Sequence, residues 1–146
     1  MNNNSMIVKP FQELTLTELF EIVRARFDVF VGEQQILEPE YDDTDYKSTH
    51  LFFQEEGKVI AYARVFPGEH PGVWQLGRML TVRRKEGWGA AIINGAKAYV
   101  KEQGGRQILL HAQVQASGFY AKQGFQTCSD VFEEAGIPHV MMRLSL

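Results

Sequence analysis

A basic turn at residues 83–89 carries the residue types that hold phosphate groups. Arg83, Arg84 and Lys85 supply three positive charges, and Gly87 and Gly89 follow them. Glycine lets an anion approach the backbone, and the free N–H groups and the positive dipole end at the start of a helix attract it. The turn therefore predicts a binding site for a phosphorylated ligand.

The segment 76–100 has the pattern of a strand, this turn and an amphipathic helix. Apolar residues dominate up to Val82, and after the glycines they recur at helical spacing. The helical apolar residues are Ile92, Ile93, Ala96, Tyr99 and Val100. A helix beginning just after the glycines is what an anion site at this turn requires.

The pattern of the turn excludes two common phosphate motifs. No Gly-Lys-Ser/Thr follows the glycines, as a P-loop requires, and the glycines do not form G-x-G-x-x-G. A nucleotide-binding domain is therefore disfavoured. A glycine turn that merely joins a strand to a helix is the remaining structural alternative.

Length and composition indicate one globular domain. The chain has 146 residues, of which 45% are hydrophobic and 12% aromatic, enough for one packed core. The net charge of −3 argues against a general nucleic-acid or anionic-membrane binder. Cys128 is the single cysteine and fits a reducing compartment. Without a membrane-length apolar run or signal-peptide pattern, we expect a cytoplasmic protein, with residues 1–5 as a disordered tail and 6–146 as the domain.

Sequence patterns predict an α+β fold around one mixed sheet. A capping box at Thr15 and Glu18 opens a helix with apolar residues up to Val31 on one side, and Gly32 ends or bends it. The acidic segment 38–48 lacks periodicity and is expected to be a long, solvated loop. Further helices are expected from residue 90 to the glycines at 104–105 and over 117–123. Strands are expected at 6–9, 50–54, 58–66, 73–82, 107–113, 125–132 and 139–146.

Two of these segments resemble the acetyltransferase superfamily known as GNAT. Arg84-x-x-Gly87-x-Gly89-Ala90 is similar to its R/Q-x-x-G-x-G/A turn, and Phe119-Tyr120-Ala121-Lys122-Gln123-Gly124-Phe125 to its F-Y-x-x-x-G-F segment. Further matches, spread over residues 7–144, resemble the ElaA-like branch. They are Arg26 with residues 29–34, Gly77-Arg78, His111-Ala112-Gln113, and residues 136–142. The resemblance implies a single GNAT-type domain with a mixed six- to seven-stranded sheet and about four flanking helices.

The turn departs from the superfamily pattern. The connection between Arg78 and Arg84 is about two residues short, and Lys85 replaces a customary glycine. Glu86 places a carboxylate beside the expected pyrophosphate, and Trp88 stands where a small aliphatic residue is more usual. We expect a tighter turn, in which the three cations offset Glu86.

The resemblance implies that this region binds acetyl-coenzyme A. The fourth strand would orient the acetyl group through its backbone, and the turn would hold the pyrophosphate. The coenzyme-binding residues implied are Leu80, Thr81, Val82, Arg83, Arg84, Lys85, Gly87, Trp88, Gly89, Ala90, Gln113, Ser117 and Tyr120. No metal is expected.

Tyr120 is the candidate general acid. A phenol stays protonated at neutral pH and can donate to a departing thiolate; an aromatic packing role is the structural alternative. For the general base the candidates are Glu33, His111 and His139, each with a structural alternative, and a water chain serves equally well.

Arg26 and Arg78 lie among apolar elements, where we expect them to pair with the acidic segment or with Glu33. Binding of a substrate carboxylate by Arg26 and Arg78 is the minority interpretation, as is attraction of a cationic amine by the acidic segment. Glu33 is a further candidate for substrate binding. Cys128 is expected to be a small core residue.

These features together predict an acetyl-CoA-dependent N-acetyltransferase that acts on a primary amine, of a small molecule or a peptide, by direct transfer in a ternary complex. The alternative is a non-catalytic acyl-CoA-binding or regulatory module. A homodimer is also open, since GNAT domains are often dimeric.

Overall fold

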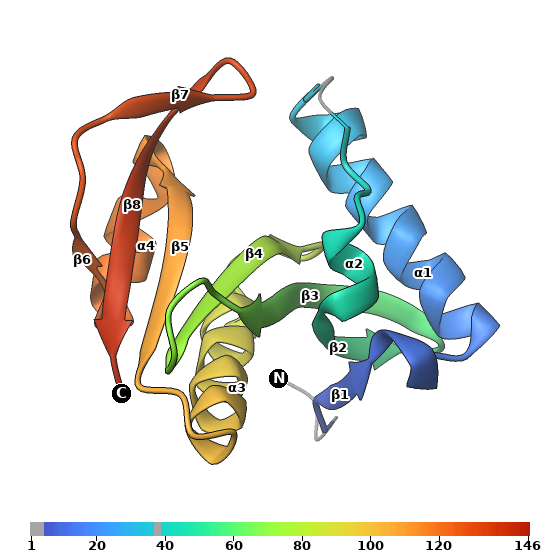
Figure 1. Cartoon of the computed structure of the whole chain (residues 1–146). Coiled ribbons are helices and arrows are strands. Elements are labelled where there is room, and N and C mark those ends of the chain that lie inside the picture. Colours follow the sequence, from blue (N-terminus) through green and yellow to red (C-terminus); the bar gives the residue numbers. More distant parts are fainter. Residues whose placement is uncertain (1–4, 37–38) are drawn as a thin grey trace.

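The computed structural model describes residues 5–36 and 39–146, which form one α+β domain (Figure 1). Residues 1–4 of the expected tail and Glu38 of the acidic segment lie outside the described residues. The helices are α1 (Leu16–Arg26), α2 (Thr44–Lys47), α3 (Trp88–Glu102) and α4 (Ser117–Lys122). The strands are β1 (Ile7–Pro10), β2 (Thr49–Glu55), β3 (Lys58–Pro67), β4 (Val73–Thr81), β5 (Gln107–Gln113), β6 (Gln126–Thr127), β7 (Phe132–Glu134) and β8 (Ile137–Ser145).

One mixed sheet joins these strands in the order β1-β2-β3-β4-β5-β8-β6, with β7 also paired to β8. Every pairing is antiparallel except that of β4 with β5. The predicted fold class is confirmed, but the described sheet has eight strands instead of six or seven. The difference arises because the strand expected at 125–132 is two short strands, β6 and β7, with irregular backbone between them.

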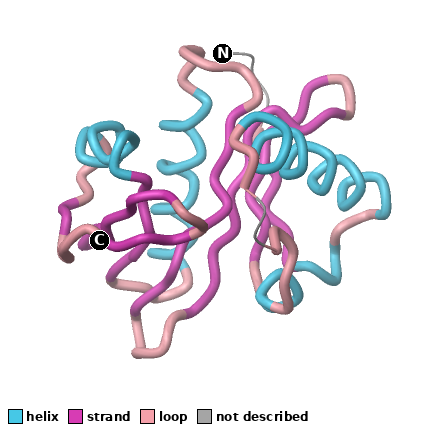
Figure 2. Tube along the Cα trace, turned by 90° about the horizontal axis from the view of Figure 1, so that it is seen from above, coloured by secondary structure: helices cyan, strands magenta, loops and turns pink. Residues whose placement is uncertain are grey.

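Helices cover both faces of the sheet (Figure 2). Side chains alternate across a strand, so Leu51 and Phe53 of β2 pack with α3, whereas Phe52 packs with Ile22 of α1. Trp88, the first residue of α3, is only 2% exposed and lies against the ring of Phe53. The two resulting cores hold the sheet between α1 on one side and α3 on the other.

The first helix differs from its prediction. Its capping box at Thr15 is present, but α1 ends at Arg26 and continues as a π-helix, Phe27–Glu33. Leu16, Phe20 and Phe27 are 87%, 59% and 52% exposed, so the apolar residues do not share one buried side. At 3.6 residues per turn these three residues fall within about 40° of one another, away from the buried Ile22.

Two other predictions are wrong. The acidic segment contains α2, and the Glu40 and Asp45 side chains are only 8% and 13% exposed instead of solvated. Cys128 is exposed, in the irregular backbone between β6 and β7, and not in the core. No helix in the described ranges is long and apolar enough to cross a bilayer.

Gly105, which follows the end of α3, provides a test of packing. A Cβ at this position would overlap the side chain of Val100 and lie 2.8 Å from Cδ1 of Trp74 and 2.9 Å from the Val100 carbonyl oxygen. We expect Gly105→Ala to lower the free energy of unfolding in urea by about 2 kcal/mol, because backbone cannot move aside cheaply.

Gly118→Ala in α4 is the matched control. A Cβ there meets nothing within 4 Å, so alanine should stabilise the helix, by up to about 1 kcal/mol. Equal effects of the two substitutions would contradict the packing described around Gly105.

Candidate active site

The central feature of the site is the parting of β4 from β5. The two parallel strands pair only along Val73–Gln75 and Gln107–Leu109. Beyond Gln75, β4 stays paired to β3 and β5 to β8, and the two strands diverge (Figure 1). A cleft of about 720 Å³ lies at the divergence.

Residues from five parts of the chain line this cleft. They come from β3, from β4, from β5 with α4, from the β7–β8 hairpin, and from the π-helix with the segment after it. Those used below are Phe30, Gln34, Glu40, Arg64, Arg78, Met79, His111, Gln113, Tyr120, Glu134 and His139.

A β-bulge shapes the β4 side of the cleft. The register against β3 shifts between Tyr62 and Arg64, and Arg78 has a positive φ of 52°. After the bulge the Val82 N–H donates to the Ile60 carbonyl at 2.8 Å, so it points toward β3. Because neighbouring residues of a strand direct their N–H groups to opposite edges, the Thr81 N–H points to the edge left free by β5. Of the predicted backbone contacts, Thr81 is therefore better placed than Val82.

Tyr120 lies in α4 with its hydroxyl directed across the cleft to β4. The hydroxyl donates to the Met79 sulfur at 3.5 Å, and the ring packs edge-on against Phe119 and Phe125. Burial raises the pKa of Tyr120 to about 12. The phenol is thus protonated at neutral pH and bonded to a thioether, which is a weak acceptor.

The predicted phosphate turn has backbone geometry suited to an anion. Lys85 and Gly87 both have positive φ, 61° and 84°, and α3 begins directly afterwards without a side-chain cap. The N–H groups of its first turn are therefore unclaimed by a capping side chain. The turn residues are not among those that line the cleft, but they follow the end of β4.

The side chains of the turn have partners of their own. Arg83 forms a bidentate pair with Glu55, and Arg84 donates to the Thr81 carbonyl and to Glu33. The Trp88 indole lies in the core and donates to Glu86, so this residue can offer a ligand only its backbone. Leu80 likewise is buried in the core beside α1.

Gly89 has a packing role that the sequence did not indicate. A Cβ on Gly89 would lie 3.0 Å from Cζ of Phe119 and 3.3 Å from Cε of Met79. The glycine therefore allows α3 to approach α4 and β4. This close approach lets the Phe119 ring pack beside Tyr120. Ala90 follows it in the first turn of α3.

The other predicted coenzyme residues lie near the end of β5. Gln113 lines the cleft and donates to the Gln34 side chain at 3.1 Å, which connects β5 to the π-helix across the opening. The Ser117 hydroxyl donates to the Val114 carbonyl at 2.7 Å and helps to start α4.

The three candidate bases have different environments. His111 lines the cleft, and its Nδ1 lies 2.9 Å from Glu134. The His139 side chain is only 8% exposed, with Nδ1 2.7 Å from the Ile137 carbonyl. Glu33 is paired with Arg84 and is not among the cleft residues.

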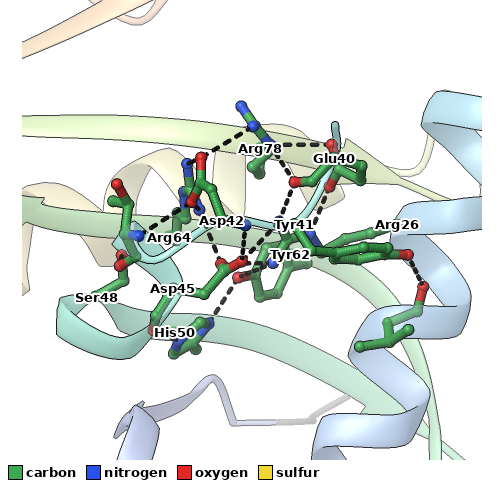
Figure 3. A network of polar contacts seen from close by, with 12 residues as sticks. Arg26, Glu40, Tyr41, Asp42, Asp45, Ser48, His50, Tyr62, Arg64 and Arg78 are labelled. Atoms are coloured by element: carbon green, nitrogen blue, oxygen red, sulfur yellow. Dashed lines mark hydrogen bonds and ion pairs between the residues drawn. The ribbon is translucent and has the colours of Figure 1, made fainter. Parts of the chain in front are cut away.

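Six charged side chains form a cluster beside the cleft (Figure 3), and three of them, Glu40, Arg64 and Arg78, line it. Arg26 pairs with Glu40 at 2.6 Å and Asp45 at 2.7 Å, and Arg78 pairs with Glu40 at 2.9 Å. Arg64 of β3 completes the cluster by contacting Asp42 and Asp45, both at 2.8 Å. The predicted pairing of Arg26 and Arg78 with the acidic segment is confirmed, and Glu33 pairs elsewhere.

The cluster shifts the pKa values of two of its carboxylates in opposite directions. Burial alone would raise the pKa of Asp45, but hydrogen bonds and charges from Arg26 and Arg64 lower it below the usual range. For Glu40, burial prevails over the nearby arginines and its pKa is raised. Such groups depend on one another, because each would be costly to bury alone.

Arg64, Met79 and Glu134 are site residues that the sequence analysis missed. Arg64 stands within the apolar run of β3, and a lone arginine there signals a buried acidic partner. Met79 and Glu134 offered no such signal, because their roles depend on which strands become neighbours.

Comparisons with known proteins agree with this geometry. Residues 21–146 match the family model of the acetyltransferase (GNAT) domain. The chain is 37% identical over 151 residues to the UPF0039 protein C11D3.02c of Schizosaccharomyces pombe, with all of both chains covered. An acyl-CoA N-acyltransferase structure from Pseudomonas aeruginosa is 29% identical with a TM-score of 0.88, covering 96% of this chain and 99% of that one.

The fold is shared more widely. Escherichia coli ElaA is 24% identical with a TM-score of 0.89, covering 97% of this chain and 99% of that one, which is a likeness of fold. Fold and comparisons define an acyltransferase of the type that uses acyl-CoA. The chain belongs to the GNAT acetyltransferase family.

The charged cluster predicts the effect of removing Arg26. Arg26→Met leaves buried carboxylates with fewer counter-charges, so we expect the free energy of unfolding to fall by about 3 kcal/mol. Urea denaturation measures it. Arg24→Met, which removes a half-exposed arginine paired with Glu21, should change stability by less than about 1 kcal/mol. Equal losses of stability in the two variants would contradict a stabilising role for the buried ion pairs of Arg26.

His50 predicts how stability depends on pH. Its Nδ1 lies 2.6 Å from the Tyr62 hydroxyl and its Nε2 3.0 Å from the Asp45 carbonyl. Burial lowers the pKa of His50 from the ordinary 6.5. The unfolded chain therefore takes up a proton that the folded chain does not, and stability present above pH 6.5 is lost as the pH falls below it.

We expect the free energy of unfolding to fall through His50 as the pH is lowered from 7 to 5.5. His50→Gln should flatten this part of the curve, whatever its effect on absolute stability. His70→Gln, at an exposed position, should keep the wild-type slope. An unchanged slope in His50→Gln would show that another group is responsible.

Proposed function

We propose that the protein is an acetyl-CoA-dependent N-acetyltransferase that acetylates a primary amine by direct transfer. One observation supports this most strongly: the Tyr120 hydroxyl donates to a sulfur atom of β4, where β4 has lost its pairing with β5. A hydroxyl already directed at a thioether is well placed to meet the sulfur of a thioester. When bound, acetyl-CoA supplies the activated acetyl group and a thiolate leaving group.

The residues present fit the coenzyme at two points. The free edge of β4, including the Thr81 N–H, is suited to a pantetheine arm and to the acetyl carbonyl. The turn at Lys85 and Gly87, with the start of α3, is suited to the pyrophosphate. Arg84 would exchange its present contact with Glu33 for phosphate, since that ion pair is on the surface, with both side chains 54% exposed.

Tyr120 acts as the general acid in this proposal. It donates its proton to sulfur as the C–S bond breaks and the C–N bond forms. The raised pKa keeps the proton on the phenol at neutral pH until negative charge develops on sulfur. Gln113, which lines the cleft, and Ser117, at the start of α4, are the proposed polar contacts for the arm.

Direct transfer to the amine is favoured over a covalent acyl-enzyme. Cys128 is exposed between β6 and β7 and is not among the cleft residues. The acceptor amine is proposed to enter past the π-helix and Glu134, where the cleft also holds Phe30 and Arg78. A single exposed cysteine also fits our expectation of a cytoplasmic enzyme.

Calorimetric titration with acetyl-CoA, followed by thiol release against a panel of amines, tests the proposal. The panel should include benzylamine, spermidine, glycine methyl ester and a tripeptide with a free N-terminus. Binding together with thiol release for one amine would support it. Lack of binding at millimolar acetyl-CoA would overturn it. Binding of acetyl-CoA without thiol release, whichever amine of the panel is added, would favour the non-catalytic module.

The proposed role of Tyr120 predicts a selective loss of turnover. Tyr120→Phe keeps the ring packing but removes the donor, so kcat should fall about 100-fold while the Kd for acetyl-CoA stays within about twofold. Tyr99→Phe is the control, because it removes a hydroxyl bonded to Thr49 outside the cleft. A Tyr120→Phe protein with unchanged kcat would refute the general-acid assignment.

A further inference from the structure

The tip of the β7–β8 hairpin brings a carboxylate to the mouth of the cleft. Glu134 pairs with Ile137, and the two residues between them, Ala135 and Gly136, have φ of 54° and 75°. Positive φ at both central residues is the geometry of a tight type I′ turn, which fixes the hairpin register. Glu134 is consequently held at a defined place relative to β8.

The strand registers place His111 on the same face as Glu134. His111 pairs with Met141 on β8, Gln113 with His139, and His139 in turn with Phe132 on β7. Because alternate residues share a face, His111, His139 and Glu134 all lie on one side of these three strands. The Phe132 ring contacts the His111 imidazole edge-on and stacks on that of His139.

The contact with Glu134 determines which nitrogen of His111 is available. Nδ1 lies 2.9 Å from Oε1 of Glu134, and an ionised carboxylate can only accept hydrogen bonds. Nδ1 therefore carries the hydrogen, and in the neutral imidazole the lone pair resides on Nε2. The side chain is 30% exposed and lines the cleft.

The other two candidate bases lack this combination. His139 is nearly buried, its Nδ1 donates to the Ile137 carbonyl, and its Nε2 lies 3.6 Å from Glu134. Glu33 is paired with Arg84 away from the cleft residues. His111 alone among the three has a ring nitrogen that is free to accept a proton in the cleft.

Building on the proposed function, we propose that His111 is the general base and that Glu134 is its positioning residue. Glu134 fixes the ring orientation and the Nδ1–H tautomer, and its negative charge stabilises the imidazolium that forms. Nε2 of His111 then accepts a proton from the acceptor ammonium group.

The protons balance as follows. An alkylammonium acceptor loses two protons on becoming an amide. His111 passes one of them to solvent, which its exposure permits, and the other replaces the proton that Tyr120 gives to sulfur. The products are the N-acetylated amine, the free thiol and one proton released to solvent.

The tautomer of His111 is the first test, and it requires no acceptor. Two-dimensional ¹⁵N–¹H spectra of the protein at pH 8.5, where imidazoles are mostly neutral, should show the hydrogen of His111 on Nδ1. Glu134→Ala should lose this preference, and Glu134→Gln should keep it, since its amide oxygen still accepts. Glu133→Ala, an exposed neighbour on β7, should leave the spectrum unchanged. An Nε2–H tautomer in the wild type would overturn the proposal.

Kinetics with the best amine of the panel provide the second test. His111→Gln should lower kcat about 100-fold and Glu134→Ala about tenfold, with the KM for acetyl-CoA unchanged. The double variant should be no slower than His111→Gln alone, because Glu134 acts through His111. Glu133→Ala should match the wild type.

The outcomes separate the two proposals. Unchanged kcat in His111→Gln, or losses that multiply in the double variant, would overturn the pairing of His111 with Glu134 while leaving the enzyme intact. If the wild type binds acetyl-CoA but acetylates no amine, the proposed function fails instead, and the tautomer alone decides whether Glu134 positions His111.

Discussion

The parting of β4 and β5 beyond Gln75 is the constraint on which the rest of the structure depends. A strand edge left without a partner must satisfy its backbone groups in another way, through water or a ligand. Here the free edge faces a cleft that also receives Tyr120 from α4 and His111 from β5. The same strand then leads into the turn at the start of α3. One irregularity of the sheet therefore places the proposed acyl-group site and the proposed phosphate site in sequence along the chain.

The charged cluster explains how β4 keeps its course after it leaves β5. Arg78 sits at the bulge and is held by Glu40, which also binds Arg26 from the end of α1. Desolvating so many charges is costly, and an apolar cluster of similar volume would often be as stable. The ion pairs instead require each charged side chain to meet a particular partner. They connect four elements: α1, the acidic segment that precedes β2, β3, and β4. We interpret the cluster as a brace that fixes the shape of one cleft wall more than it raises stability.

Local features of the sequence were read correctly, and features set by tertiary contacts were not. The capping box at Thr15, the two strands on either side of Gly57 and the helix end before Gly104 depend on nearby residues and were predictable. The exposed Cys128, the buried Trp88 and the π-helix after Arg26 depend on packing against distant elements. In the site, Tyr120 was found through its motif, whereas Glu134 became recognisable only once β7, β8 and β5 were adjacent. Gly89 was expected to contact the coenzyme, and the structure shows that it also leaves room for the Phe119 ring.

The central claim, that the space between β4 and β5 receives the acyl-CoA, is tested most directly by backbone amide NMR during titration with acetyl-CoA. The account predicts saturable shifts at residues 76–90, which cover the free edge of β4 and the start of α3, and at 113–120, which lead into α4. Amides of β1 and of the adjoining part of β2 should not move. Shifts confined to those outer strands, or no shifts at millimolar acetyl-CoA, would contradict the account.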